Sequence, residues 1–79
     1  MGSEWAKDAV RRAEEITREL AESCAGCSLA YQRREARFAL KAADETVYFS
    51  AHDYETRKGV DWAQLRKDVL ARAAELSGS

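Results

Sequence analysis

Two stretches of the chain, one near each end, have the apolar spacing of amphipathic helices. In the first stretch the apolar positions recur every three or four residues, at Ala9, Ala13, Ile16, Leu20 and Cys24. In the second stretch they are Trp62, Leu65, Val69, Ala73 and Leu76. Because this spacing keeps apolar side chains on one helix face, we predict helices over about residues 3–24 and 61–76.

Local signals mark the ends of both predicted helices. Ser3 is a good N-cap for the first helix, and Gly26 is a natural stop after it. Asp61 and Gln64 fit a capping box, in which the Asp side chain accepts the third backbone N–H and the Gln side chain reaches back.

Between the helices, apolar and polar residues alternate as they do in strands with one buried face. Phe38 and Leu40 alternate with Arg37 and Lys41. A run rich in β-branched and aromatic residues follows at 46–52, with Phe49 on its apolar side. We therefore predict an antiparallel hairpin in which Phe38 and Phe49 are neighbours on the core side.

A third strand is expected ahead of this hairpin, beginning with Leu29 and Tyr31. The odd-numbered apolar positions of that segment do not continue into Phe38, where even positions are apolar. A turn or bulge near residues 33–35 must therefore intervene.

These elements predict an α+β fold in one domain, residues 1–79. Its two layers follow the order α-β-β-(β)-α, with an antiparallel hairpin or three-stranded meander packed against two helices. The alternative is a small all-α bundle, because segment 28–43 is rich in helix formers and Ser28 could cap it. We favour strands, since segment 46–52 needs a partner for its backbone groups.

Composition narrows the functional classes. The chain has 79 residues, with 13 Lys and Arg against 14 Asp and Glu, for a formal net charge of −1. A dedicated nucleic-acid binder usually has a basic excess, so this balance disfavours that class. Lys7 and Asp8 interrupt any early apolar run. We expect a soluble cytoplasmic protein with no signal peptide and no membrane partner.

The motif Cys24-Ala25-Gly26-Cys27 has the C-x-x-C spacing of a redox dithiol. Its position at the C-terminal end of a helix disfavours a thiolate. We interpret Cys24 as a small core residue and Cys27 as a residue at the loop edge, and we keep Cys24 and Cys27 as a candidate redox pair. His52 is the one histidine and is expected far from Cys27, so no metal site and no cofactor are predicted.

Ser50, His52 and Asp53 are the residue types of a hydrolytic triad. On a strand, however, Ser50 and His52 would share a face and Asp53 would point away, so it could not orient the imidazole. We predict no catalytic residues and no enzyme.

The one basic concentration comprises Arg33, Arg34, Arg37 and Lys41. On strands, Arg37 and Lys41 would share an outward face with Tyr48 in reach, an arrangement that suits an anion or a nucleic acid. A solvated charged face is the preferred interpretation. The order helix–three strands–helix resembles double-stranded-RNA-binding domains in topology alone, because the lysine-rich start of that family's second helix is replaced here at residues 58–63.

The chain as a whole resembles small de novo designed α/β proteins. It has no proline, although usage averages about 5%. Its helices are dense in Ala, Glu, Arg and Lys, its caps are clean, and its ends at 1–2 and 77–79 are typical of added sequence. The resemblance implies a stable scaffold, produced by recombinant expression, without intrinsic biochemical activity.

Three alternatives to an inactive scaffold stay open. The first is a natural module, such as a phage or bacterial regulator, that binds another protein. Nucleic-acid binding through the basic concentration and thiol redox chemistry through the two cysteines rank below it.

Overall fold

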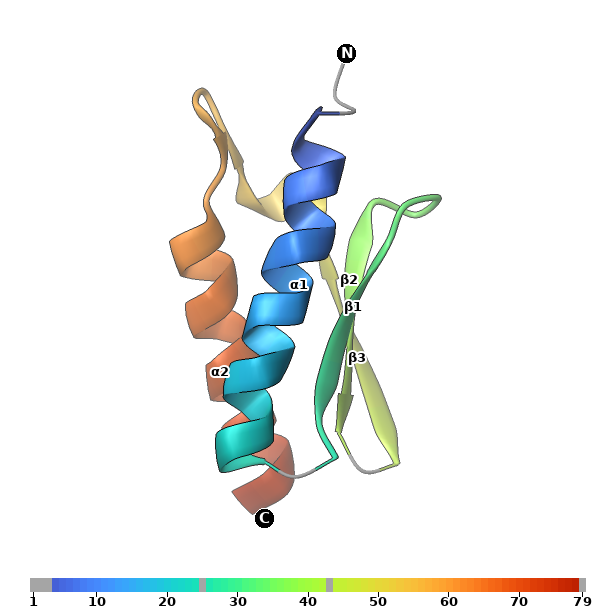
Figure 1. Cartoon of the computed structure of the whole chain (residues 1–79), viewed down its shortest axis with the longest axis vertical. Helices are drawn as coiled ribbons and strands as arrows, with labels where there is room; N and C mark the ends of the chain where they lie inside the picture. Colours follow the sequence, from blue (N-terminus) through green and yellow to red (C-terminus); the bar gives the residue numbers. More distant parts are fainter. Residues whose placement is uncertain (1–3, 25, 43, 79) are drawn as a thin grey trace.

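The computed structural model describes residues 4–24, 26–42 and 44–78. It contains two helices, a three-stranded sheet and a short two-stranded sheet (Figure 1). The elements in chain order are α1 (Glu4–Ser23), β1 (Ser28–Gln32), β2 (Arg37–Ala42), β3 (Glu45–Ser50), the 3₁₀ turn η1 (Ala51–Tyr54), β4 (Glu55–Thr56), β5 (Gly59–Val60) and α2 (Trp62–Gly78).

The three longer strands form an antiparallel meander in the order β1-β2-β3. The predicted α+β class is therefore confirmed. The alternative helix over residues 28–43, and with it the all-α bundle, is wrong. The physical reason is the pairing requirement: a strand in the region of residues 46–52 needs neighbouring backbone partners, and β2 provides them.

The register confirms the predicted pairing of the two phenylalanines. Phe38 lies opposite Phe49, and Leu40 lies between Leu29 and Val47. These side chains face α1 and α2, and Phe38 and Leu40 are fully buried. Both helices begin at the same end of the molecule and lie side by side over one face of the sheet (Figure 1). The core therefore lies between one helical layer and one sheet face.

The change of parity between β1 and β2 occurs at a tight turn. Residues 33–36 form this turn, in which the Ala36 N–H donates to the Arg33 carbonyl at 3.3 Å. Ala36 has φ of 52°, a left-handed conformation that non-glycine residues seldom adopt. The predicted turn is therefore confirmed. Because of it, the odd-numbered positions of β1 and the even-numbered positions of β2 face the same core.

The strand predicted for residues 46–52 ends earlier, at Ser50. The Ala51 N–H donates to the Ala36 carbonyl at 2.9 Å, and the Ser50 hydroxyl accepts the His52 N–H at 3.3 Å. These bonds turn residues 51–54 into a 3₁₀ helix, and His52 therefore lies outside the sheet. The early end of the strand has a non-local cause, because the Ala51 N–H is bound by a carbonyl of the β1–β2 turn.

The capping box at α2 is half formed. Asp61 Oδ1 accepts the Gln64 N–H at 3.2 Å, as predicted. The reciprocal bond is absent, because the Asp61 N–H donates to the Tyr54 carbonyl at 2.7 Å and the Gln64 side chain donates to Asp68 at 2.8 Å. The predicted cap for α1, Ser3, lies outside the described residues.

Candidate functional site: the open face of the sheet

The face of the sheet that points away from the helices presents a grid of nine side chains, which we call the open face. Alternation along the three strands and their register place them in three cross-strand rows. The rows are Gln32–Arg37–Ser50, Ala30–Ala39–Tyr48 and Ser28–Lys41–Thr46. In Figure 1 neither helix covers this side of the sheet.

Charge is distributed unevenly between the open face and the rest of the chain. The nine open-face residues include two cations, Arg37 and Lys41, and no carboxylate, although acidic residues outnumber basic ones in the whole chain. Glu45 is the one acidic residue of the three strands, and its place opposite Ala42 puts it on the helix-facing side. The open face is therefore locally positive in a chain of net charge −1.

Arg37 and Tyr48 form the centre of the site. The guanidinium carbon of Arg37 lies 3.9 Å from the centroid of the Tyr48 ring, a cation–π contact. Arg37 Nε donates to Gln32 Oε1 at 2.6 Å. Tyr48 is 51% exposed and is one of two exposed large hydrophobic residues among those described. The guanidinium is thus held from two strands next to an accessible aromatic ring.

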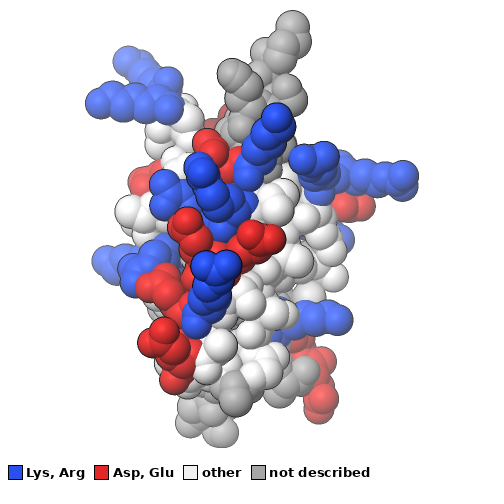
Figure 2. All heavy atoms as spheres, viewed as in Figure 1, with Lys and Arg blue, Asp and Glu red and all other residues white. Residues whose placement is uncertain are grey.

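The four basic residues predicted from the sequence all lie on the β1–β2 hairpin. Arg37 and Lys41 lie on the open face, as expected, whereas Arg33 and Arg34 lie exposed in the turn. The β4–β5 hairpin carries Arg57 and Lys58 in its turn and reaches the same end of the molecule (Figure 1). Figure 2 shows basic side chains projecting at both upper corners of this end. That the two turns lie at the same end of the molecule could not be predicted from the sequence, because it depends on the tertiary fold.

Cys24 and Cys27 are brought together, with a Cα–Cα distance of 5.7 Å and a disulfide between them. The turn that joins them uses Gly26 at φ of 88°. Both residues belong to the core, and Cys27, which is 5% exposed, is buried rather than at the loop edge as predicted. A buried disulfide is poorly accessible to an attacking thiol, so this geometry favours a structural role for the pair.

The Ser50, His52 and Asp53 set does not assemble as a triad. His52 Nδ1 contacts the Glu55 carboxylate, and the Ser50 hydroxyl caps η1 by accepting the His52 N–H. His52 follows β3, whereas Cys27 precedes β1, so the antiparallel meander separates them at opposite ends. Over the described residues, no three His, Cys, Asp or Glu side chains cluster closely enough to hold a metal ion.

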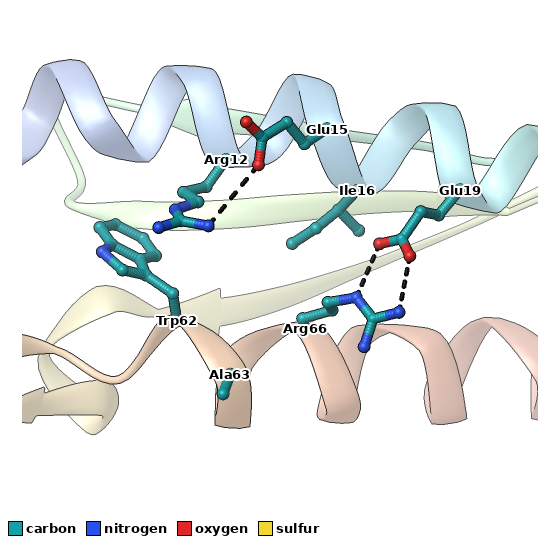
Figure 3. A pocket seen from close by; sticks show the side chains of 7 residues that line it. All are labelled: Arg12, Glu15, Ile16, Glu19, Trp62, Ala63 and Arg66. Atoms are coloured by element: carbon teal, nitrogen blue, oxygen red, sulfur yellow. Dashed lines mark hydrogen bonds and ion pairs between the residues drawn. The ribbon is translucent and has the colours of Figure 1, made fainter.

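A groove of about 530 Å³ lies between α1 and α2 (Figure 3). Ile16 and Trp62 provide its apolar lining, and Arg12 lies 5.9 Å from the Trp62 ring. Arg66 bridges the helices by donating to both Glu19 oxygens, at 2.7 and 2.6 Å. This bond lowers the pKa of Glu19. Arg12 also pairs with Glu15 at 3.6 Å, so the charged groups of the groove are paired with each other, in contrast to the cations of the open face.

Comparison of the chain with family models, with curated proteins and with solved structures finds no match. Neither helix, over the described residues, is long and apolar enough to cross a membrane.

Proposed function

We propose that this chain is a non-catalytic binding domain that takes single-stranded nucleic acid on its open face. The observation that carries the proposal is the composition of the grid: cations, an exposed aromatic ring and uncharged polar groups, with no carboxylate. Net charge argued against this class, but a ligand responds to the local charge of the surface it touches. The proposal replaces an inactive scaffold as the leading interpretation.

Two kinds of contact are combined on this surface. Lys41 on the open face and Arg33 and Arg34 in the adjoining turn are exposed, and none of the three has an ion pair to a residue that the structure describes. They are suited to phosphates. Tyr48 offers a π-face to a base, and such stacking is tolerant of sequence because every base has one.

The dimensions of the open face fit a short segment of single-stranded nucleic acid. Arg37 and Lys41 are four residues apart on β2, which corresponds to roughly 13 Å. The sheet is three strands wide, and its central position on this face is the small residue Ala39, which lies opposite Tyr48, while Arg37 lies over the Tyr48 ring. An open sheet surface with a small residue at its centre suits splayed bases better than it suits the rounded backbone of a duplex.

The first test is fluorescence anisotropy with a labelled thymidine dodecamer at several salt concentrations. We expect Arg34→Ala/Lys41→Ala to weaken binding and to reduce the salt slope by about 1.4, since each phosphate contact with a single strand contributes about 0.7. The matched control is Arg18→Ala/Lys67→Ala, which removes the same charge from exposed positions on the helices. Equal losses in the two variants would show that binding follows net charge, which contradicts the proposal.

The second test separates stacking from charge. Tyr48→Ala should weaken binding by about 5- to 100-fold, whereas Tyr48→Phe should retain most of the affinity because the ring face remains. Circular dichroism of each variant checks that the fold is intact. Failure of the wild-type chain to bind any oligonucleotide, together with capture of an acidic peptide, would favour a protein partner instead.

A further inference from the structure

We propose that Arg37 is a guanine-reading residue of the open face. The inference rests on the proposed function and goes beyond it, because stacking and phosphate contacts alone give at most a modest preference among bases. It depends on how the guanidinium group is held and on which of its nitrogens remain available.

Arg37 is fixed by two contacts that leave its outer edge open. Its Nε donates to Gln32 on β1, and its guanidinium carbon lies 3.9 Å from the centroid of the Tyr48 ring on β3. The two terminal nitrogens, Nη1 and Nη2, have no hydrogen bond or ion pair to any residue that the structure describes. Arg37 therefore presents two parallel N–H donors from a side chain that is already ordered.

This donor pair matches one base better than the others. Guanine presents two adjacent acceptors, O6 and N7, and a bidentate arginine is the commonest specific contact to it. Adenine replaces one of these acceptors with an amino donor, and the pyrimidines lack N7. Because Gln32 and Tyr48 already restrict the side chain, less conformational entropy is lost when both bonds form.

Lys41 provides the internal comparison. It lies on the same strand and face, but its ammonium is a single point of charge, and no side-chain hydrogen bond to a described residue holds it. Such a group suits a phosphate at any sequence. The two cations of the open face are thus expected to differ in role, with Lys41 contributing affinity and Arg37 contributing base preference.

The test compares thymidine dodecamers that carry one central guanine, adenine, cytosine, thymine or 7-deazaguanine. For the wild-type chain, we expect the guanine oligonucleotide to bind about 5- to 100-fold more tightly than the thymine one. The analogue 7-deazaguanine lacks the N7 acceptor and should lose most of this preference. Arg37→Lys should keep much of the binding to thymidine but bring the guanine-to-thymine ratio close to one.

Arg18→Lys is the matched control, because it makes the same exchange at an exposed position on α1, away from the open face, and it should leave the ratio unchanged. The measured quantity is a ratio of affinities, so a general loss of folding or charge does not move it. Equal binding of all five oligonucleotides by the wild-type chain would overturn the inference while leaving the proposed function intact. A guanine preference that persists in Arg37→Lys would overturn it as well. If no oligonucleotide binds, the proposed function fails first.

Discussion

The two faces of the three-stranded sheet are built from the same strands and share almost no chemistry. On β2, Phe38 and Leu40 are fully buried beneath the helices, whereas Arg37 and Lys41 point to the uncovered side. Residues adjacent in sequence therefore lie on opposite faces, one in the core and one on the face for which we propose binding. The charge of a whole chain therefore says little about the charge of one of its faces.

The largest expected effect comes from the buried face. Phe38→Ala should lower the free energy of unfolding by about 3–5 kcal/mol, because it removes a fully buried ring and leaves a cavity. That is a large part of the stability expected for a domain of this size. Lys41→Ala, three residues along the same strand, should change it by no more than about 0.5 kcal/mol. Urea titration followed by circular dichroism measures both.

If Phe38→Ala does not fold, Phe38→Leu should show a smaller loss in the same direction. Similar losses for Phe38→Leu and Lys41→Ala would mean that the two faces do not differ in burial as described.

The second effect concerns the disulfide at the end of α1. Reduction should lower the free energy of unfolding by about 2 kcal/mol, since the Cys24–Cys27 bond closes a short loop and constrains the unfolded chain only modestly. Thermal melts with and without a phosphine reductant measure this change. A Cys24→Ala/Cys27→Ala variant should not respond to the reductant, and nucleic-acid binding should survive reduction if the pair is purely structural.

The third effect concerns the edge of the sheet, where β1 is hydrogen-bonded to α1. Thr17 Oγ1 on α1 accepts the Leu29 N–H of β1 at 2.9 Å and donates to the Ala13 carbonyl at 2.8 Å. Thr17→Val keeps the shape but leaves the Leu29 N–H without this partner, at a cost of about 1–3 kcal/mol. Thr17→Ser retains the hydroxyl and is the control. A Val variant as stable as the Ser variant would contradict the role of this bond.

The smallest effect is a pH dependence at η1. Burial, and then the 2.7 Å hydrogen bond that the Tyr54 hydroxyl donates to Asp68, raise the pKa of Tyr54 above its ordinary value of about 10. The unfolded chain therefore loses this proton first as pH rises. The stability that Tyr54 contributes is fully present below pH of about 10 and decreases above it.

Tyr54→Phe should remove this contribution, so the difference in stability between wild type and variant should shrink as the pH rises from about 10 to about 11. A difference between them that stays constant across this window would show that Tyr54 titrates normally in the folded state.

Much of the fold followed from sequence because its main signals are local. The alternation around Phe38 and Phe49 predicted the paired strands, and the helix stripes predicted which residues form the core. Three features did not follow. The 3₁₀ turn at Ala51 depends on a bond to Ala36, and the lost half of the capping box depends on Tyr54. Burial of Cys27 likewise depends on how α1 and β1 pack.

The sequence predicted which residues lie on the candidate site, but not the contacts of Arg37 or the absence of carboxylates around it. Alternation placed Arg37, Lys41 and Tyr48 on one face from sequence alone. The hydrogen bond from Arg37 to Gln32 could not be predicted, because it depends on the register of β1 against β2. The sequence does not give that register, since the apolar positions change from odd to even between the two strands. The lack of carboxylates on this face likewise becomes visible only when all three strands are aligned.

The sharpest test of nucleic-acid binding on the open face is an NMR titration of methyl and side-chain signals with a single-stranded oligonucleotide. The methyl groups of Ala30 and Ala39, the Tyr48 ring and the Arg37 Nε–H report on the open face. The methyl groups of Leu40 and Val47 report on the opposite, helix-covered face of the same strands. Our expectation is that the open-face signals shift in a saturable manner while the helix-covered signals change by only a small fraction of that amount. The largest shifts at Ile16 and Trp62, in the groove between the helices, would contradict it.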